Sequence, residues 1–484
     1  MLLLILPKNK AFIFGGSVMT VFSIIKLSEL EGAKRIDAEY YRPEYLNLLA
    51  KLKKAGCVPI KNVAFPVKRK FKPIAEEYFD YIEISEVDIS TGIFNISKIL
   101  GKEAPKRAQW IVKKDDLLIS TVRPIRNAIA LIRNDKKNLI CSSGFAVIHP
   151  YPNKIKTNYL FLYFKLPFVA KLLDRYTTAT EYPAITWNDV LNLPIYVGKE
   201  DFQRKISLLI EDNVFDLLYR SQQQYFQAEI RLLEELGLKD FKPKFKKIYT
   251  TKLFDSLSVH RIDAEYFQPA YEEIMNKLKE NNIELKPLGK FILSIRKGIE
   301  PGSENYQNEG VSFIRVSNLS KLGFINRDKK YLSEDLYKQL RETYEPKQGD
   351  LLITKDATPG IAYVVKEQIK GIISSGILRL QINDSEIDKE YLALCINSLI
   401  GKIQVERDVG GSIIPHWKPD QVKKLKIPIL SLSAQRKLSS LIQQSYQERR
   451  KAKELLEEAK KAVEIAIERG EEEGYRYLSE KGIL

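Results

Sequence analysis

The stretch RIDAEYYRPEY at residues 35–45 returns almost unchanged as RIDAEYFQPAY at residues 261–271. Further landmarks follow in the same order in both halves of the chain. They are DLLIS at 116–120 and DLLIT at 350–354, SSG at 142–144 and 374–376, ITW at 185–187 and PHW at 415–417, and QRK at 203–205 and 435–437. A series of matches in this register indicates that the chain consists of two copies of one unit.

Each copy has the same expected local structure. A short amphipathic helix begins near the proline after RIDAEY, at residues 45–54 and 271–279. Short apolar runs, separated by Gly, Pro, Asn and Asp, then predict strands. A further helix follows at 159–174 and 391–407, and a short strand ends the copy. Each copy is therefore expected to be a mixed α/β (α+β) globular domain.

Two long stretches, residues 201–236 and 431–469, contain neither Gly nor Pro. Their apolar residues step by three or four, which predicts two long amphipathic helices. At ~1.5 Å per residue, a helix of ~36 residues is a rod of roughly 54 Å. The expected N-caps are Asp201 and Ser433, and the expected C-caps are Gly237 and Gly470.

The apolar stripe of each long helix needs a partner. An antiparallel coiled coil of the two helices satisfies both stripes, places a globular domain at each end and gives pseudo-two-fold symmetry. In the alternative arrangement, each helix packs on its own globular domain. The predicted division is a leader (1–19), domain 1 (20–200), long helix 1 (201–237), domain 2 (238–430), long helix 2 (431–470) and a C-terminal tail (471–484).

The leader has no counterpart in the second copy. The sequence from Met19 resembles a true start, so residues 1–18 are interpreted as an over-extended reading frame or a disordered leader.

Composition limits the class of protein. The 484 residues carry a formal net charge of +16, which attracts polyanions such as nucleic acid or an anionic membrane; a role in solubility alone is the alternative. No run approaches the ~18–20 apolar residues that cross a bilayer. Three scattered cysteines and three histidines do not favour a disulfide scaffold or a zinc site, and few thiols fit a cytoplasmic location.

The sequence lacks the common catalytic signatures. It contains no GxxxxGK[ST], no GxGxxG between a strand and a helix, and no Asn or Asp followed by Pro-Pro-aromatic. Neither a Ser–His–Asp nor a Cys–His constellation can be assembled from it. The acidic runs at 234–235 and 471–473 are interpreted as solvated helix surface. A catalytic site is therefore not expected.

Basic residues recur at loop positions in both copies, beside strands that correspond. Lysine and arginine there suit DNA phosphates, and arginine also suits the O6 and N7 atoms of guanine. Small hydroxyl-bearing loops before the recurring Trp positions are weaker candidates, with a simple turn as the alternative. For the basic residues the alternative is solvated loop charge. The candidate DNA-binding residues are Lys68, Arg69, Lys70, Arg123, Arg126, Thr177, Thr178, Arg296, Lys297, Lys355, Ser412 and His416.

Two further groups of residues have structural interpretations. Trp187 and Trp417 are expected to be core anchors rather than platforms on which bases stack. Asp37 and Asp263 within RIDAEY are expected to be turn or cap residues, and the aromatic residues beside them are either structural or a docking surface for a partner.

Taken together, the two RIDAEY(Y/F)xP segments, two α/β domains and two long helices resemble the specificity subunit of type I restriction–modification enzymes. The stretches RKG at 296–298 and GDLLITKD at 349–356 also resemble the target recognition domains of that family. The resemblance covers nearly everything from about Val21 to the end. It implies a non-catalytic protein in which each globular domain recognises one half of a bipartite DNA sequence.

The resemblance also implies partners. The paired helices would set the gap between the half-sites and offer docking surfaces to two methyltransferase subunits, and the assembly would recruit motor/nuclease subunits. S-adenosylmethionine, ATP and Mg²⁺ would belong to those partners, with no cofactor in this chain. A rod of ~54 Å corresponds to about 16 base pairs. The loops at 123–126 and 355–358 differ between the copies, as expected if the two domains recognise different sequences.

Other functions remain open on the sequence alone. One is the specificity subunit of an ATP-independent restriction system, or an orphan subunit, which neighbouring genes would distinguish. A methyltransferase with diverged motifs would bind S-adenosylmethionine as an isolated chain. A non-catalytic scaffold that binds nucleic acid nonspecifically would bind scrambled duplexes equally well.

Overall fold

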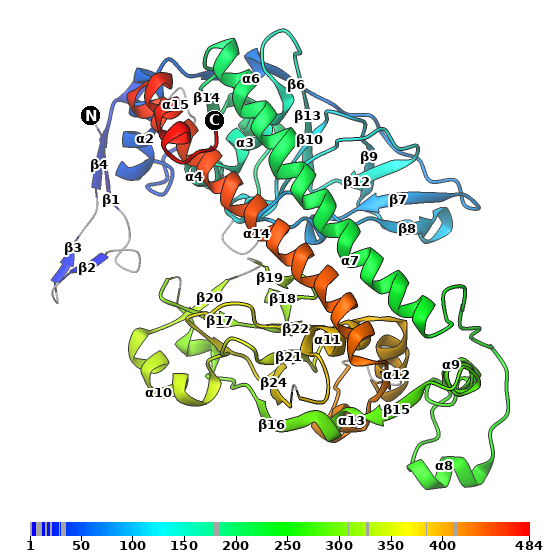
Figure 1. Ribbon diagram of the computed structural model, residues 1–484. Coiled ribbons are helices and arrows are strands. Elements are labelled where there is room, and N and C mark those ends of the chain that lie inside the picture. Colours follow the sequence, from blue (N-terminus) through cyan, green and yellow to red (C-terminus); the bar gives the residue numbers. More distant parts are fainter. Residues whose placement is uncertain are drawn as a thin grey trace. The chain divides into compact units, whose positions relative to one another are not determined.

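The computed structural model describes residues 2–5, 12–14, 17–19, 22–28, 30, 35–178, 183–307, 309–325, 329–383, 385–409 and 415–484 (Figure 1). The chain divides into two compact units. Unit 1 comprises Met1–Asp216 and Lys451–Leu484, and unit 2 comprises Leu217–Arg450. Both units combine strands and helices, as expected for a mixed α/β protein.

Among the described residues of unit 1, the strands form two four-stranded sheets and three two-stranded ones. One four-stranded sheet is antiparallel, in the order β11-β10-β13-β6; the other has the order β8-β7-β12-β9, with β7 and β12 parallel. The strands are β1 Leu2–Ile5, β2 Phe12–Phe14, β3 Ser17–Met19, β4 Phe22–Ile25, β5 Val58–Pro59, β6 Ala64–Pro66, β7 Tyr78–Ile82, β8 Ser97–Leu100, β9 Ala108–Ile111, β10 Leu117–Ser120, β11 Ile129–Leu131, β12 Leu139–Ser142, β13 Phe145–Pro150 and β14 Pro194–Ile195.

Strands β1, β2 and β3 fall within the predicted leader. Strand β1 pairs with β4, and β2 pairs with β3. The described residues of the leader thus form paired strands, and the interpretation of residues 1–18 as an over-extended reading frame or a disordered leader stays a prediction. The absence of a repeat counterpart is unaffected.

The helices of unit 1 lie before and after these sheets in the sequence. The predicted helix at 159–174 is two helices, because the chain breaks at Leu166 and Pro167 begins the second, where its missing N–H costs nothing. The α-helices are α2 Pro43–Lys54, α3 Thr157–Lys165, α4 Pro167–Arg175, α5 Trp187–Asn192, α6 Glu200–Leu208 and α15 Glu471–Glu480.

The two larger sheets of unit 2 correspond in strand order to those of unit 1, except that no strand among the described residues of unit 2 takes the place of β9. The antiparallel sheet β22-β21-β24-β16 corresponds to β11-β10-β13-β6, and in β20-β17-β23 the parallel pair β17 and β23 corresponds to β7 and β12. The strands are β15 Glu284–Pro287, β16 Ile292–Lys297, β17 Val311–Ile314, β18 Leu319–Ser320, β19 Gly323–Phe324, β20 Lys330–Leu332, β21 Leu351–Thr354, β22 Ala362–Val364, β23 Gly371–Ile373, β24 Ile377–Ile382 and β25 Lys426–Ile429.

The helices of unit 2 follow the same plan, with the predicted helix at 391–407 again split in two, here at Ser398. Helix α10 packs beside β23. The α-helices are α8 Leu253–Val259, α9 Pro269–Glu280, α10 Glu334–Tyr344, α11 Lys389–Asn397, α12 Leu399–Val409 and α13 Pro419–Lys424.

Helices are present at both long stretches without Gly or Pro. The first consists of α6, a π-helical turn η6 (Leu209–Phe215) and α7 (Asp216–Glu235). The second is one continuous helix, α14 (Leu432–Arg469), of 38 residues. Within unit 2, α7 and α14 are in contact and antiparallel: Ser221 and Ser445 lie 3.1 Å apart through their hydroxyl oxygens, and Arg220 lies 3.9 Å from Glu448.

The predicted caps are partly right. Gly237 has a φ of 66°, and its N–H and that of Leu238 donate to the carbonyls of Glu234 and Leu233, which is a Schellman motif. Gly470, at φ 101°, ends α14. The predicted N-caps are wrong, because each helix begins earlier. Asp201 lies within the first turn of α6, and at α14 the Ser431 hydroxyl accepts from the N–H of Ala434.

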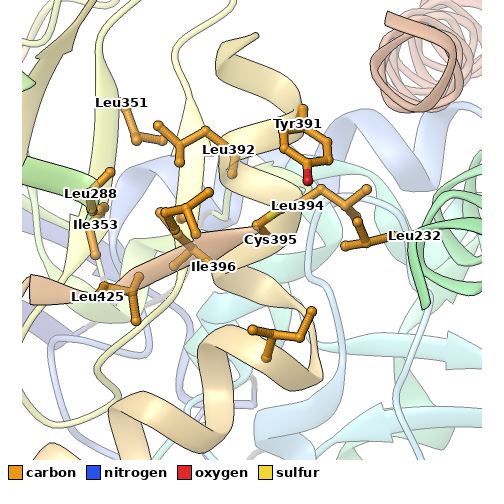
Figure 2. Close-up of a cluster of buried hydrophobic side chains, with 14 of the residues drawn as sticks. Leu232, Leu288, Leu351, Ile353, Tyr391, Leu392, Leu394, Cys395, Ile396 and Leu425 are labelled. Carbon is orange, nitrogen blue, oxygen red and sulfur yellow. The ribbon is translucent and has the colours of Figure 1, made fainter. Parts of the chain in front are cut away.

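The core of unit 2 is built around α11. Figure 2 shows its side chains Tyr391, Leu392, Leu394, Cys395 and Ile396 among Leu351 and Ile353 of β21, Leu232 of α7, Leu288 and Leu425. All of these side chains are buried. Burial of such side chains contributes about 1.5–3 kcal/mol each, so α11 and α7 hold the strand whose end carries the candidate site.

The RIDAEY segment is structural in both units. Arg35 forms an ion pair with Asp37 and donates to the carbonyls of Tyr176 and Thr177, at the end of α4. Arg261 and Asp263 form the same ion pair, and Arg261 donates to the carbonyls at the end of α12. These guanidinium groups bind helix carbonyls that have no intrahelical partner. Both aspartates also begin turns, because the N–H groups of Tyr40 and Tyr266 donate to the carbonyls of Asp37 and Asp263, and this confirms the prediction that they are turn or cap residues.

Candidate nucleic-acid interface

The basic candidates beside the main sheet gather at one end of it in each unit. Strands β6 and β10 are both antiparallel to β13, so they run in the same direction and end at the same side of the sheet. Lys68 follows the end of β6, and Arg123 follows the end of β10. Strands β16 and β21 have the same relation through β24, which places Lys297 and Lys355 at the corresponding end in unit 2.

Lys68 and Lys70 are exposed beside two indole rings in unit 1. The Lys68 ammonium lies 5.2 Å from the centre of the Trp187 ring, and Trp187 packs edge-to-face on Trp110 at 5.4 Å. The backbone of Lys70 is bridged to Trp110. The cation–π contact holds the Lys68 side chain against the protein while its ammonium stays available to a phosphate.

Arg69 has a structural role instead. Its guanidinium donates to Asp116, a fully buried carboxylate at 2.6 Å, and Asp116 also lies 2.9 Å from the Nδ1 atom of His149 and accepts from the N–H of Lys113. A buried carboxylate without a cation is costly, so Arg69 is committed to this pair. Arg69 therefore stabilises the fold through Asp116, and a contact between Arg69 and DNA stays a prediction.

In unit 2, the corresponding buried aspartate is paired with an arginine from a different strand. Asp350 is the counterpart of Asp116, and it too is buried and accepts from a backbone N–H, that of Lys347. Its cation is Arg379 of β24, whose Nε lies 3.6 Å from the carboxylate. By strand register, Arg379 occupies the position of Val147, and Gly298 follows Lys297 where Arg69 follows Lys68.

Arg123 and Arg126 lie on the 3-10 turn η5 (Pro124–Arg126). Arg123 has a φ of 48°, and its N–H donates to the carbonyl of Pro183. Lys165 stabilises the turn: its side chain is fully buried, and its ammonium donates to the carbonyls of Asn127 and Ile89. Burial lowers the pKa of Lys165 to about 7. The two arginine side chains are partly exposed.

The hydroxyl-bearing candidates have different environments. The Thr177 hydroxyl donates to the carbonyl of Asp174 at the end of α4, so it terminates that helix. Thr178 is exposed directly after it. Ser412 lies outside the described residues.

Arg296 and Lys297 are both exposed, at the end of the edge strand β16. Their strand register places Lys297 at the position that Lys68 has in unit 1. Comparison of the two copies in sequence had matched residues 296–297 with the region of Lys68, and the strand register shows that Lys297 is the residue that corresponds to Lys68.

Lys355, Asp356 and His416 come together at the end of β21. The Lys355 ammonium and the Nδ1 atom of His416 lie 2.6 and 2.8 Å from the same carboxylate oxygen, Oδ1 of Asp356. Burial alone would raise the pKa of Asp356, but the hydrogen bonds from Lys355 and His416 outweigh it and lower the pKa. The Lys355 side chain is only 12% exposed, whereas that of His416 is 60% exposed.

Backbone bonds correct the alignment of the two Trp residues. The N–H of Ile185 donates to the carbonyl of Thr121, and the N–H of Trp417 donates to that of Lys355 in the same position of unit 2. Trp417 therefore corresponds to Ile185, and Trp187 to Pro419, the first residue of α13 as Trp187 is of α5. Trp417 is fully buried, as expected of a core anchor, and its indole donates to Asp408.

Sequence reasoning missed residues at the same sheet ends. The residues predicted from sequence do not include Asp356, which binds both Lys355 and His416. Arg107 is exposed, and its carbonyl accepts from the N–H of Ser143, beside the turn that begins β13. Arg315 directly follows β17, where unit 1 has Glu83. The repeated SSG segment was the available signal, since both arginines lie beside it.

Other kinds of site are not indicated within the described residues. Among them, no group of three or more His, Cys, Asp and Glu side chains is arranged to hold a metal ion. None of the helices described is both long and apolar enough to span a membrane.

Comparison with known proteins assigns the family. The sequence matches the family described as type I restriction modification DNA specificity domain over residues 40–213 and 280–460. A segment of 114 residues is 30% identical to the specificity subunit of the type I restriction enzyme HindI from Haemophilus influenzae; this is 22% of the present chain and 23% of that relative.

Two solved specificity subunits are also similar. The HsdS subunit of Thermoanaerobacter tengcongensis has 22% identity and a TM-score of 0.32, covering 86% of this chain and 96% of that one. The S subunit of M. genitalium has 14% identity and a TM-score of 0.36, covering 85% and 94%. The assignment rests on the family match, which covers most of both repeats: the chain belongs to the specificity subunits of type I restriction–modification systems.

Proposed function

We propose that this chain is the DNA sequence-recognition subunit of a type I restriction–modification complex, and that each unit recognises one half of a bipartite target. The observation that carries the proposal is the repeated family match, one in each half of the sequence. Support comes from the sheet end of each unit, where exposed cations such as Lys68 and Lys297 occupy corresponding positions. Phosphate contacts of this kind position a protein on DNA without specifying sequence.

The long helices are proposed to set the gap between the half-sites. In this proposal α6–α7 and α14 form an antiparallel coiled coil with pseudo-two-fold symmetry, which the contacts of Ser221 with Ser445 support. The helices also dock two methyltransferase subunits, and the complex recruits motor/nuclease subunits. Catalysis, with S-adenosylmethionine, ATP and Mg²⁺, belongs to those partners, and this chain is non-catalytic.

The decisive experiment is to map methylated bases. The chain would be co-expressed with a candidate methyltransferase subunit from its own source organism, in a host without other DNA methylation, and the genome sequenced by a single-molecule method that detects methylated bases. The proposal predicts one bipartite motif with a fixed gap. Methylation without a motif, or S-adenosylmethionine binding by the isolated chain, would contradict it.

Removing the two exposed cations of β16 is expected to weaken DNA binding without changing the motif. In the Arg296→Ala, Lys297→Ala double variant, two phosphate contacts are lost, so the slope of log affinity against log salt should fall by about 2. Fluorescence anisotropy of the assembled methyltransferase with its target duplex, over a range of salt concentrations, measures this. Lys338→Ala on α10 is the matched control, because Lys338 is an exposed lysine of the same unit on a helix rather than at the end of β16. An unchanged slope in the double variant would remove both residues from the interface.

Lengthening one spacer helix is expected to widen the permitted gap. Four residues inserted into α7 add ~6 Å, which corresponds to about two base pairs of duplex DNA. The same four residues inserted into the lysine-rich segment after Gly237, at 242–247, should leave the gap unchanged. Sequencing of methylated DNA from both strains measures the gap. An identical gap in the two strains would exclude the ruler role of the helix.

A further inference from the structure

His416 has the geometry of a hydrogen-bonding group that is fixed on one side and largely exposed to solvent. Its Nδ1 atom lies 2.8 Å from Asp356, and 60% of its side chain is exposed. Lys355 binds the same carboxylate oxygen from the interior, where its side chain is mostly buried. The carboxylate is therefore held by a buried lysine and in turn orients an exposed imidazole.

The carboxylate also determines the tautomer of His416. Its lowered pKa keeps Asp356 ionised at neutral pH, and an ionised carboxylate only accepts hydrogen bonds. The Nδ1 atom of His416 must therefore carry the proton. In the neutral imidazole the outer nitrogen, Nε2, is then an acceptor.

The backbone around His416 is fixed by its neighbours. Asp356 and His416 form an antiparallel bridge, the N–H of Trp417 donates to the carbonyl of Lys355 at 2.7 Å, and the N–H of Ala357 donates to that of Pro415. The next side chain, Trp417, is fully buried. A group held in this way suits sequence recognition, because little conformational freedom is lost on binding.

Unit 1 has the same backbone frame without these side chains. The bridge between Asp356 and His416 corresponds to one between Val122 and Ala184, and Lys355 corresponds to Thr121. Two side chains that cannot form hydrogen bonds thus replace the Asp–His pair. The difference lies at one point of a shared scaffold, as expected of a position that distinguishes two half-sites.

We propose that Nε2 of His416 accepts a hydrogen bond from the exocyclic amino group of one base, the N6 amine of adenine or the N4 amine of cytosine, in the half-site bound by unit 2. These amines are the hydrogen-bond donors that bases present in the major groove. Asp356 is the positioning residue, and Lys355 holds Asp356. The inference rests on the proposed function, because it assigns the chemistry of one contact within that half-site.

Base analogues that lack the amine test the inference. Once the motif is mapped, each adenine of the second half-site is replaced in turn by nebularine and each cytosine by zebularine, and the affinity of the assembled methyltransferase is measured. Removal of the amine at one position should weaken binding by the wild type about tenfold. In His416→Ala the same analogue should have no further effect, whereas His416→Gln, which retains an acceptor, should recover sensitivity to it.

Two further variants separate positioning from contact. Asp356→Val introduces the residue that unit 1 has at this position, Val122, and removes the carboxylate that keeps the proton on Nδ1 of His416. Sensitivity to the analogue should therefore fall, while the first half-site is still recognised. Lys297→Ala should lower affinity for every duplex and keep full sensitivity to the analogue.

The outcomes distinguish this inference from the proposed function. Equal binding of target and scrambled duplexes by the wild type would overturn the proposed function itself. Selective binding in which no analogue effect depends on His416 would overturn only the inference. As a further arm, each guanine of the second half-site is replaced by 7-deazaguanine, which lacks the N7 acceptor. If only this analogue has an effect that depends on His416, the inference is also overturned, because the imidazole would then donate to guanine.

Discussion

Replacement of Asp116 by alanine is expected to lower the free energy of unfolding of unit 1 by about 3–5 kcal/mol. The carboxylate is fully buried, and it accepts hydrogen bonds from Arg69 and from the N–H of Lys113. Without it, the arginine and the amide lose a buried partner, and truncation of one member of such a pair leaves the other uncompensated. Denaturant unfolding followed by tryptophan fluorescence measures the loss.

The fluorescence can be assigned to unit 1 because two of the three tryptophans, Trp110 and Trp187, lie there. In a Trp417→Phe background, the signal reports on unit 1 alone. The control introduces into unit 1 the residues that unit 2 has at these positions. Arg69→Gly should lower the stability of unit 1, and the additional substitution Val147→Arg, at the position of Arg379, should recover part of that loss. Stability unchanged by Asp116→Ala would show that the ion pair does not support the fold.

Trp417→Ala is expected to destabilise unit 2 by about 3–5 kcal/mol, the usual cost of truncating a buried aromatic side chain. The side chain is fully buried in the core that contains α11, and its indole N–H donates to Asp408 at 3.0 Å. Removal leaves a cavity and deprives a partly buried carboxylate of a donor. Hydrogen exchange of peptides from unit 2, followed by mass spectrometry, measures the loss of protection.

Trp187→Ala is the matched control for this variant. Trp187 is only partly buried, so its truncation should cost clearly less, and the change should be confined to peptides of unit 1. Equal losses in the two variants would contradict the alignment of Trp417 with the buried Ile185 rather than with Trp187.

The repetition and the long helices could be predicted because they depend on local sequence. An apolar period of three to four residues without Gly or Pro predicts a helix in any environment, and α14 runs from Leu432 to Arg469 accordingly. Details that depend on a single bond were less predictable. Asp201 and Ser433 are good N-cap types, yet both helices begin a residue or more earlier, where chain direction and tertiary contacts decide.

The environments of the candidate site residues were even less predictable from the sequence. A basic segment at 68–70 predicts a charged surface, but its lysines and its arginine have different environments. Lys68 and Lys70 are exposed, while Arg69 is committed to Asp116, 47 positions away in sequence. Alternation along an extended segment sends adjacent side chains to opposite faces, and only the packed sheet shows which face contains a buried carboxylate.

By itself, the sequence was sufficient to predict the duplication, the mixed α/β class and the two long helices, because these follow from period and repeated order; the family came from a resemblance, which the family match then showed. Only the tertiary structure decided that Arg69 and Arg379 serve the same buried charge from different strands, that Trp417 corresponds to Ile185, and that His416 lies against Asp356. The reason is physical. Burial and pairing of charges depend on distances between strands far apart in the chain, and those distances exist only once the sheets have formed.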